Sequence, residues 1–228
     1  MSGAFEKAVS LIIEGNYVLL DILTVTLKMS ITSSIVALLI GVPLGVLFGS
    51  TSFKGKKALI VFNRTMMGLP PVVCGLLCFL MFCGVGPLRH LQLLYTVAGM
   101  VIAQVILITP VVVGSMEPFV AGIYPEIRET AMGLGIGRGK TLMLIINEST
   151  YQILSTYLLG FSRALAEVGA VSMVGGAIVF KTNVMTTAIM NYTNMGDFDM
   201  ALALGIILMG ISLIVNIIVS LMQRRPEF

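Results

Sequence analysis

The sequence predicts an all-helical integral membrane protein with about five transmembrane helices, and its composition and apolar stretches lead to this fold class. Of its 228 residues, 57% are apolar and 11% are charged, whereas about 25% of the residues of soluble domains carry charge. The mean hydropathy is +1.01. With 14 basic and 11 acidic residues, the chain cannot cover the surface of a soluble protein of this length. The composition therefore excludes an ordinary cytosolic domain, a disordered chain and a disulfide-stabilised scaffold.

Five stretches are long and apolar enough to be spans, since a transmembrane helix needs about 20 mostly apolar residues. The predicted spans are 18–49, 58–84, 92–115, 151–178 and 199–222. The first is longer than necessary, and its Asp21 and Lys28 place its first residues at or outside the membrane interface. We expect residues 1–228 to form a single transmembrane domain, whose longest loop lies at about 117–150.

The basic residues predict which loops face the cytoplasm. An odd number of spans puts the two chain ends on opposite sides of the membrane. Basic residues are enriched in short cytoplasmic loops. One side has eight of them and the other three: Lys54, Lys56, Lys57, Arg128, Arg138, Lys140, Arg224 and Arg225 against Lys7, Arg89 and Lys181. The N-terminus is therefore expected outside, and the C-terminus and the 117–150 loop inside.

The sequence offers little for catalysis or metal binding. It has one histidine, His90, which excludes a pair of haem-ligating histidines and a zinc site with several histidines. Cys74, Cys78 and Cys83 lie in one apolar run without a second ligand cluster, so we interpret them as packing residues. We predict no catalytic residue and no metal site.

A glycine-rich stretch at 133–141, Gly-Leu-Gly-Ile-Gly-Arg-Gly-Lys-Thr, matches no nucleotide-binding motif. A P-loop needs a glycine five residues before the glycine of its final Gly-Lys-Thr, and Leu134 occupies that position. The dinucleotide-binding pattern fails because Arg138 stands at its third glycine. We therefore expect this chain to bind no nucleotide and no other cofactor.

The residues before these glycines predict a short amphipathic helix in the 117–150 loop. Pro125 suits the first turn of a helix, and Glu126 and Glu129 are favourable near its positive end. An apolar stripe at helical spacing comprises Ile127, Ala131 and Leu134. Gly133 and Gly135 indicate the end of the helix. Two interpretations remain open: a helix on the membrane surface, or a knob that docks in a groove of a soluble partner.

Polar and helix-breaking residues inside the predicted spans mark a candidate translocation path. Arg163 and Glu167 interrupt the fourth span one helical turn apart. They can pair and share the cost of a charge at mid-membrane, about 2.5–3.5 kcal/mol. They form either a structural ion pair or a polar feature of the path, in which Arg163 attracts an anion transiently. Pro70 and Pro71 must break the second span, for packing or beside a water-filled path, and Gly169 would let the fourth span bend.

The 117–150 loop resembles the signature of importer-type ABC permeases. That signature reads Glu-Ala-Ala, three residues, Gly, nine residues, Ile, one residue and Leu-Pro. The matching positions here are Glu129, Thr130, Ala131, Gly135 and Ile145, while Asn147 and Glu148 replace Leu-Pro. In that family the loop forms the coupling helix, which fits a cleft of the ATP-hydrolysing subunit. The resemblance implies this contact for Glu126, Ile127, Glu129, Thr130, Ala131, Leu134 and Gly135.

The resemblance extends over roughly residues 18–224 and narrows the family to oxyanion permeases. Residues 65–73 are similar to the second-span segment of oxyanion permeases, and residues 161–176 to the fourth-span segment of tungstate-type permeases. Molybdate permeases more often have Glu-Phe-Gly-Ala where residues 167–170 read Glu-Val-Gly-Ala. The resemblance implies a type I ABC importer permease fold and the import of tungstate, with molybdate or another oxyanion as the alternative.

The resemblance also implies partners and a mechanism. The chain would be a non-enzymatic permease subunit in a prokaryotic cell membrane, assembled with a second copy, two ATPase subunits and an extracytoplasmic binding protein. ATP and magnesium would be bound by the ATPase subunits, and no nucleic acid is expected. Closure of the ATPase pair would switch the spans between inward-open and outward-open states. The competing class is a secondary transporter driven by an ion gradient, which typically has two similar halves; this sequence has no internal repeat.

Overall fold

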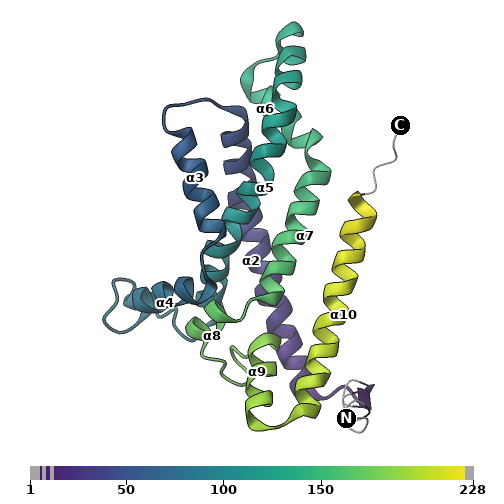
Figure 1. The fold of residues 1–228 in the computed structure, drawn as a ribbon. Coiled ribbons are helices and arrows are strands. Elements are labelled where there is room, and N and C mark those ends of the chain that lie inside the picture. The colour runs from purple at the N-terminus through teal and green to yellow at the C-terminus, as the bar shows by residue number, and fades with distance from the viewer. Residues whose placement is uncertain (1–5, 7–8, 11–12, 224–228) are drawn as a thin grey trace.

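The computed structural model describes residues 6, 9–10 and 13–223, and these residues form an elongated helical bundle (Figure 1). In chain order its elements are α2 (Tyr17–Ser50), α3 (Lys56–Met67), α4 (Pro71–Phe82), the 3-10 turn η1 (Arg89–Leu91), α5 (Val97–Gly133), α6 (Arg138–Glu148), α7 (Thr150–Ala166), α8 (Gly169–Gly175), α9 (Met185–Met195) and α10 (Phe198–Gln223). The predicted all-helical membrane fold is confirmed.

Three helices, α2, α5 and α10, are each long and apolar enough to cross a membrane. Two pairs are bent at short breaks, α3–α4 by 98° and α7–α8 by 60°. Within the described part of the chain there are thus three such helices, or up to five spans if each bent pair is one. The predictions 18–49 and 199–222 agree with α2 and α10. The prediction 92–115 falls on the first half of α5, which begins later, at Val97, and continues to Gly133. The predictions 58–84 and 151–178 fall on the two bent pairs.

The centre of the bundle is the contact between α2 and α5, which depends on glycine. Three glycines recur at every fourth residue on one face of α2: Gly41, Gly45 and Gly49. A Cβ atom added at each would lie 2.5–2.6 Å from the nearest α5 side chain, in turn that of Val112, Met116 and Val120. Small residues let helices approach closely in lipid, where packing drives association. The two longest helices therefore form one closely packed pair, against which α7 lies.

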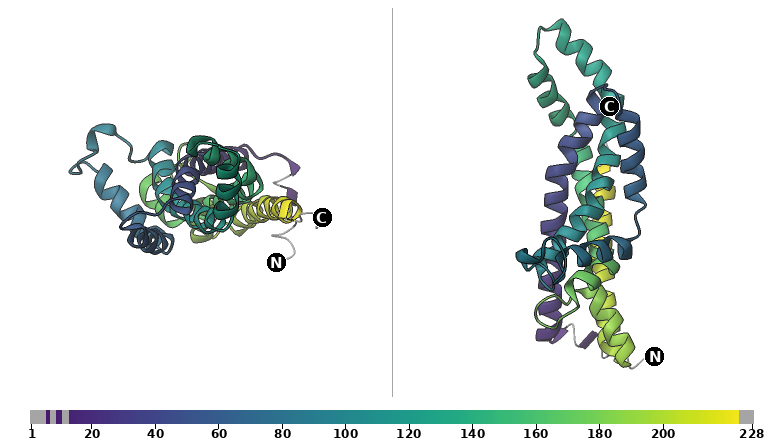
Figure 2. Two further views of the ribbon diagram at one scale, coloured as in Figure 1. Left: turned by 90° about the horizontal axis from the view of Figure 1, so that it is seen from above. Right: turned by 90° about the vertical axis from the view of Figure 1, so that its left-hand side faces the viewer.

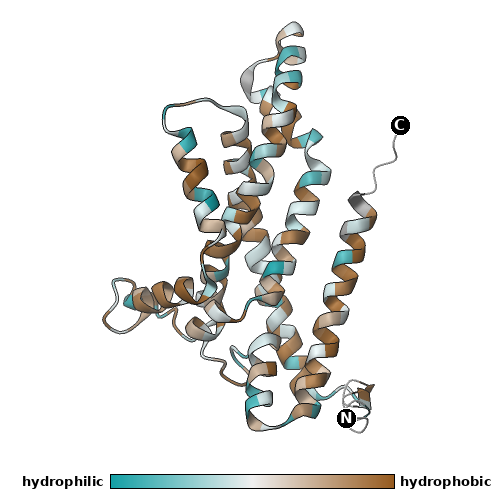
Figure 3. Cartoon of the chain, in the orientation of Figure 1, coloured by the Kyte–Doolittle hydropathy of each residue, from teal (hydrophilic) through white to brown (hydrophobic). Residues whose placement is uncertain are grey.

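Basic segments that are far apart in the sequence lie at one end of the bundle. Lys56, which follows the α2–α3 loop, and Arg128 of α5 line one pocket, so these basic segments lie at the same end. The α5–α6 hairpin projects at this end, and the C-terminal end of α10 lies on the same side (Figures 1 and 2). Apolar residues dominate α10 and α4, and hydrophilic residues occur on the hairpin and around α9 at the other end (Figure 3). The grouping of the basic segments agrees with the predicted orientation, which stays a prediction; Lys7, Arg224 and Arg225 lie outside the described residues.

Candidate translocation site and cytoplasmic hairpin

The α3–α4 corner (residues 68–70) arises where two prolines follow each other. Leu69 and Pro70 each precede a proline, which disfavours helical backbone, and Pro70 is extended with φ −61° and ψ 128°. Pro71 begins α4, where the missing N–H of proline leaves no hydrogen bond unmade. The chain turns by 98°, and α4 projects sideways from the bundle (Figure 1). The predicted break at Pro70 and Pro71 is confirmed as a sharp corner.

The α7–α8 corner (residues 167–168) forms without a proline. Glu167 is extended, with φ −76° and ψ 127°, and ends α7. Its carboxylate accepts a 3.0 Å hydrogen bond from the backbone N–H of Ala170 in the first turn of α8, where a helix favours negative charge. Its backbone carbonyl accepts a 2.9 Å hydrogen bond from the hydroxyl of Thr186. The side chain and the backbone of this buried residue therefore both stabilise the corner.

Arg163 and Glu167 do not form the ion pair that their spacing predicts. An i, i+4 approach needs a continuous helix through both residues, whereas α7 ends at Ala166. Within the residues that the structure describes, no carboxylate oxygen lies within 4.0 Å of an Arg163 nitrogen, and its buried Nε has no hydrogen-bond partner. Arg163 is thus a half-buried cation near the corner, while Glu167 caps α8.

The two corners meet in space although they are far apart in the sequence. A Cβ atom added to Gly169 would lie 2.8 Å from Cγ2 of Val72 and 3.5 Å from Cβ of Pro71. Farther along both helices, a Cβ atom at Gly75 would lie 2.7 Å from Cα of Ala170. The predicted path residues therefore gather in one region: Pro70, Pro71, Glu167 and Gly169 at the corners, and Arg163 in the last turn of α7. Their role in transport stays a prediction.

Cys74 and Cys78 pack in the core beside this crossing. They are 1% and 3% exposed and belong to a cluster that joins α4, α5 and α8. This placement agrees with the packing role predicted for them. Among the described residues, no three His, Cys, Asp or Glu side chains gather as metal ligands would.

Sequence reasoning missed the polar side chains that hold the end of α7. Gln104 of α5 is 1% exposed, and its Nε2 donates a 2.9 Å hydrogen bond to the carbonyl of Ala164. Its Oε1 accepts a 2.6 Å hydrogen bond from the hydroxyl of Ser33 on α2. The Ala164 carbonyl belongs to the last turn of α7, where helical carbonyls lack partners within the helix. A signal was present, because a glutamine inside an apolar span commonly bonds to another helix.

The α5–α6 hairpin (residues 117–148) is the second candidate site. The predicted helix start at Pro125 is wrong, because α5 continues through Pro118 and Pro125 to Gly133. The physical reason is packing: Tyr124 and Ile127 contact the core between α2 and α5, and tertiary contacts override local propensity. Because α5 is continuous, its end projects beyond the bundle (Figure 2). What this projecting end contacts stays a prediction.

The predicted end of this helix is confirmed. Gly135 has a φ of +67°, a conformation that glycine adopts readily. Its N–H bonds to the carbonyl of Met132 at 3.1 Å, and the N–H of Ile136 bonds to that of Ala131 at 2.8 Å. These two bonds form the Schellman motif that ends many helices. The turn between α5 and α6 therefore explains why a glycine stands at position 135 of the signature.

The predicted apolar stripe is divided between the core and the outside. Ala131 is 2% exposed and Ile127 packs against the core, whereas Leu134 is 71% exposed and Met132 67% exposed. The polar members of the predicted contact, Glu126, Glu129 and Thr130, are exposed as well. The hairpin tip thus displays two large apolar side chains among polar ones, away from the bundle core.

The fold defines an all-helical protein with several helices long and apolar enough to cross a membrane. The chain belongs to the family of binding-protein-dependent transport system inner membrane components, whose model matches residues 41–227. It is 33% identical over 221 residues to the tungstate uptake system permease protein TupB of Peptoclostridium acidaminophilum, with 97% of each chain covered. It is 34% identical over 203 residues to a probable anion ABC transporter permease protein of Haloferax volcanii, covering 87% of this chain and 88% of the relative.

A third relative is the TupB of Campylobacter jejuni, which is 30% identical over 220 residues, with 96% of this chain and 92% of the relative covered. These relatives are described as permeases of transport systems rather than as enzymes. The predicted family and the predicted membrane location are confirmed.

Proposed function

We propose that this chain is the membrane-spanning subunit of an ATP-driven importer that moves an oxyanion, in the first place tungstate, into the cytoplasm. The main support is the family match over residues 41–227. Two relatives described as tungstate uptake permeases, at 33% and 30% identity, support tungstate. Molybdate is the alternative, since a probable molybdenum permease of Haloferax volcanii is 27% identical over 214 residues.

The α5–α6 hairpin would receive the force of ATP hydrolysis from a separate ATPase subunit. Its exposed Met132 and Leu134 suit insertion into an apolar cleft of that subunit. Because α5 is one continuous helix of 37 residues, a displacement of its tip would be passed along the same helix to Gln104. Gln104 is bonded to the end of α7, so the displacement would be delivered to the α7–α8 corner. ATP and magnesium would be bound by the ATPase subunit.

The crossing of α4 and α8 would act as the gate, and Arg163 would attract the oxyanion in passing. The two helices are in close contact at Gly75, against the backbone of Ala170, and at Gly169, against the side chain of Val72, so a small separation opens space between them. Arg163 has no carboxylate partner within 4.0 Å among the described residues, which leaves its charge available to an anion. A cation that is only half-buried holds an anion weakly enough to release it.

The proposed assembly contains a second copy of this chain, two ATPase subunits and an extracytoplasmic binding protein. A second copy would supply a second hairpin for the ATPase pair. It would also cover apolar side chains that α4 exposes as it projects from the bundle, among them Val72, Leu77 and Leu80. The binding protein would deliver the oxyanion at the opposite end of the bundle from the hairpin.

Co-purification tests the proposal. The chain should bring down its ABC ATPase, and loaded binding protein should stimulate ATP hydrolysis by the complex. Leu134→Arg should abolish both effects while the protein still elutes as a folded species. Val85→Arg is a matched control, because Val85 is 93% exposed and lies on the loop after α4, away from the hairpin. Oxyanion uptake driven by an ion gradient in the absence of any ATPase would refute the proposal and favour a secondary transporter.

A further inference from the structure

A cationic pocket lies between the α2–α3 loop and the α5–α6 hairpin. Its volume is about 820 Å³, and polar lining residues come from both sides: Ser50, Thr51, Ser52, Lys56, Arg128 and Thr141. We propose that this pocket binds a tetrahedral oxyanion, the chemistry shared by phosphate, sulfate, molybdate and tungstate. The site is distinct from the crossing of α4 and α8, since no residue of that crossing lines it.

The charge of the pocket is the first argument. Lys56 and Arg128 line it, and none of its described lining residues is acidic. Over the described ranges, no carboxylate oxygen lies within 4.0 Å of a nitrogen of either side chain. Two cations that face a shared space without an internal counter-ion attract an anion from solution.

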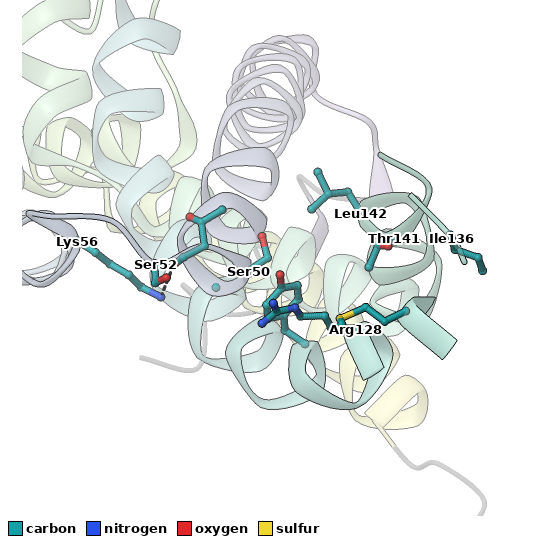
Figure 4. Close-up of a pocket in the computed structure, with 11 residues that line it drawn as sticks. Ser50, Ser52, Lys56, Arg128, Ile136, Thr141 and Leu142 are labelled. Carbon is teal, nitrogen blue, oxygen red and sulfur yellow. Dashed lines mark hydrogen bonds between the residues drawn. The ribbon is translucent and has the colours of Figure 1, made fainter. Parts of the chain in front are cut away.

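The placement of hydrogen-bond donors is the second argument. The Lys56 ammonium donates a 3.0 Å hydrogen bond to the carbonyl of Thr51, which fixes it over the 50–52 segment and leaves two of its three N–H bonds for a ligand. The guanidinium of Arg128 approaches from the other side of the pocket (Figure 4). Charge-assisted hydrogen bonds from both, with guanidinium able to bind two oxygens at once, are typical of oxyanion sites.

One further hydrogen-bond donor, Ser52, lies beside the two cations. The hydroxyl of Thr51 donates to the carbonyl of Leu47, and that of Ser50 to the carbonyl of Val46, so these two protons are already used. Ser52 has no hydrogen bond from its hydroxyl or its backbone N–H to any described residue. Ser52 can therefore complete the donor set around an ion held by Lys56 and Arg128.

The pocket is large enough to hold either a free oxyanion or the phosphate group of a lipid. A free ion fills a small part of about 820 Å³ and would lie between the cations, with water in the remainder. The pocket is also lined by Met132, Ile136 and Leu142, so the phosphate of an anionic lipid could enter with its glycerol against these apolar side chains. Basic pockets between membrane helices on the cytoplasmic side bind such head groups.

An ion in this pocket would tie the hairpin to the α2–α3 loop and the start of α3. If the hairpin transmits force, as the proposed function holds, imported oxyanion that binds here would slow further import. This consequence rests on the proposed function, whereas the binding site itself does not. A direct binding measurement therefore separates a failure of the site from a failure of the proposed function.

The test uses the full-length chain in nanodiscs of phosphatidylcholine, titrated calorimetrically with tungstate and separately with inorganic phosphate. We expect one saturable site whose affinity falls about tenfold in Lys56→Gln and in Arg128→Gln, since each loses a charge-assisted hydrogen bond. Lys57→Gln is the matched control, because Lys57 does not line the pocket, and its affinity should be unchanged. Binding of the ion at Arg163 instead would be insensitive to Lys56→Gln.

A second arm distinguishes the lipid source. In nanodiscs that contain phosphatidylglycerol, native mass spectrometry should detect retained anionic lipid on the wild type and its loss in Lys56→Gln, if lipid phosphate is the occupant. Saturable tungstate or phosphate binding in phosphatidylcholine alone identifies the free ion. The proposal is overturned if neither the free ions nor the anionic lipid bind in a manner that depends on Lys56 and Arg128.

Discussion

Replacement of Gly75 by alanine tests whether α4 and α8 cross as closely as the structure shows. A Cβ atom at this position would lie 2.7 Å from Cα of Ala170 and 3.2 Å from Cβ of Met173. Ordinary contacts of a Cβ atom begin at 3.4 Å, so the two helices must separate or shift by roughly 0.7 Å from the 2.7 Å approach, because a backbone atom cannot rotate away. We therefore expect Gly75→Ala to destabilise the protein through overpacking.

A matched pair of variants gives the expected size of this destabilisation. Overpacking a well-packed site costs about 1–3 kcal/mol, while replacing glycine by alanine inside a helix gains up to about 1 kcal/mol. Gly122→Ala in α5 has the same gain in propensity, and a Cβ atom there meets no atom within 4 Å. The difference between the two variants therefore isolates the overpacking, because the propensity cancels.

Thermal unfolding in detergent, followed by size-exclusion chromatography after heating, measures this difference. At about 2–4 °C per kcal/mol for a chain of this size, Gly75→Ala should melt about 2–12 °C below Gly122→Ala. Equal melting temperatures for the two variants would refute the close crossing of α4 and α8, and with it the meeting of the two corners.

Three further substitutions test the polar contacts of the corners and the turn of the hairpin. Gln104→Leu should lower the free energy of unfolding by about 1–2 kcal/mol, and the loss should be non-additive with Ser33→Ala in a double-mutant cycle; additivity would contradict their hydrogen bond. Glu167→Ala should cost about 0.5–2 kcal/mol through loss of a helix cap, whereas Glu167→Gln, which keeps an acceptor oxygen, should cost less in the same denaturation assay. Gly135→Ala should speed hydrogen exchange at residues 133–136, because φ +67° costs an alanine about 1 kcal/mol, and Gly139→Ala should not.

Local rules predicted the elements that depend on local chemistry. Length and hydropathy placed the spans 18–49 and 199–222 within one residue of α2 and α10 at each end, since an uninterrupted apolar run has few alternatives to a helix in lipid. The pair Pro70–Pro71 predicted its break, because the steric restriction before proline acts within two residues. Gly135 predicted the end of a helix, because the left-handed conformation that ends many helices is a local preference of glycine.

Elements that depend on distant contacts could not be predicted. The α7–α8 corner contains no proline, and its Glu167 is held by Thr186, which belongs to another helix. The spacing of Arg163 and Glu167 indicated an ion pair only on the assumption of a continuous helix. Pro125 indicated a helix start, but packing of the preceding turn against the core extends α5 through it. Each of these errors arises from a tertiary contact between residues far apart in the sequence, which a local sequence pattern cannot reveal.

The cationic pocket could not be predicted from the sequence either. Lys56 and Arg128 were used in the sequence only to orient the chain, because each belongs to a separate basic segment. The fold brings these segments together around one space of about 820 Å³. The two basic segments become neighbours only in the folded chain, where the hairpin lies beside the α2–α3 loop.

Uptake of tungstate into proteoliposomes tests the central claim most directly. The chain is reconstituted with its ABC ATPase, and loaded binding protein is added on the side opposite the ATPase. Accumulation of tungstate should require ATP on the ATPase side and should be lost in Leu134→Arg, whose hairpin tip no longer fits an apolar cleft, while Val85→Arg retains it. Accumulation that proceeds without ATP, or that persists undiminished in Leu134→Arg, would contradict an importer driven through the α5–α6 hairpin.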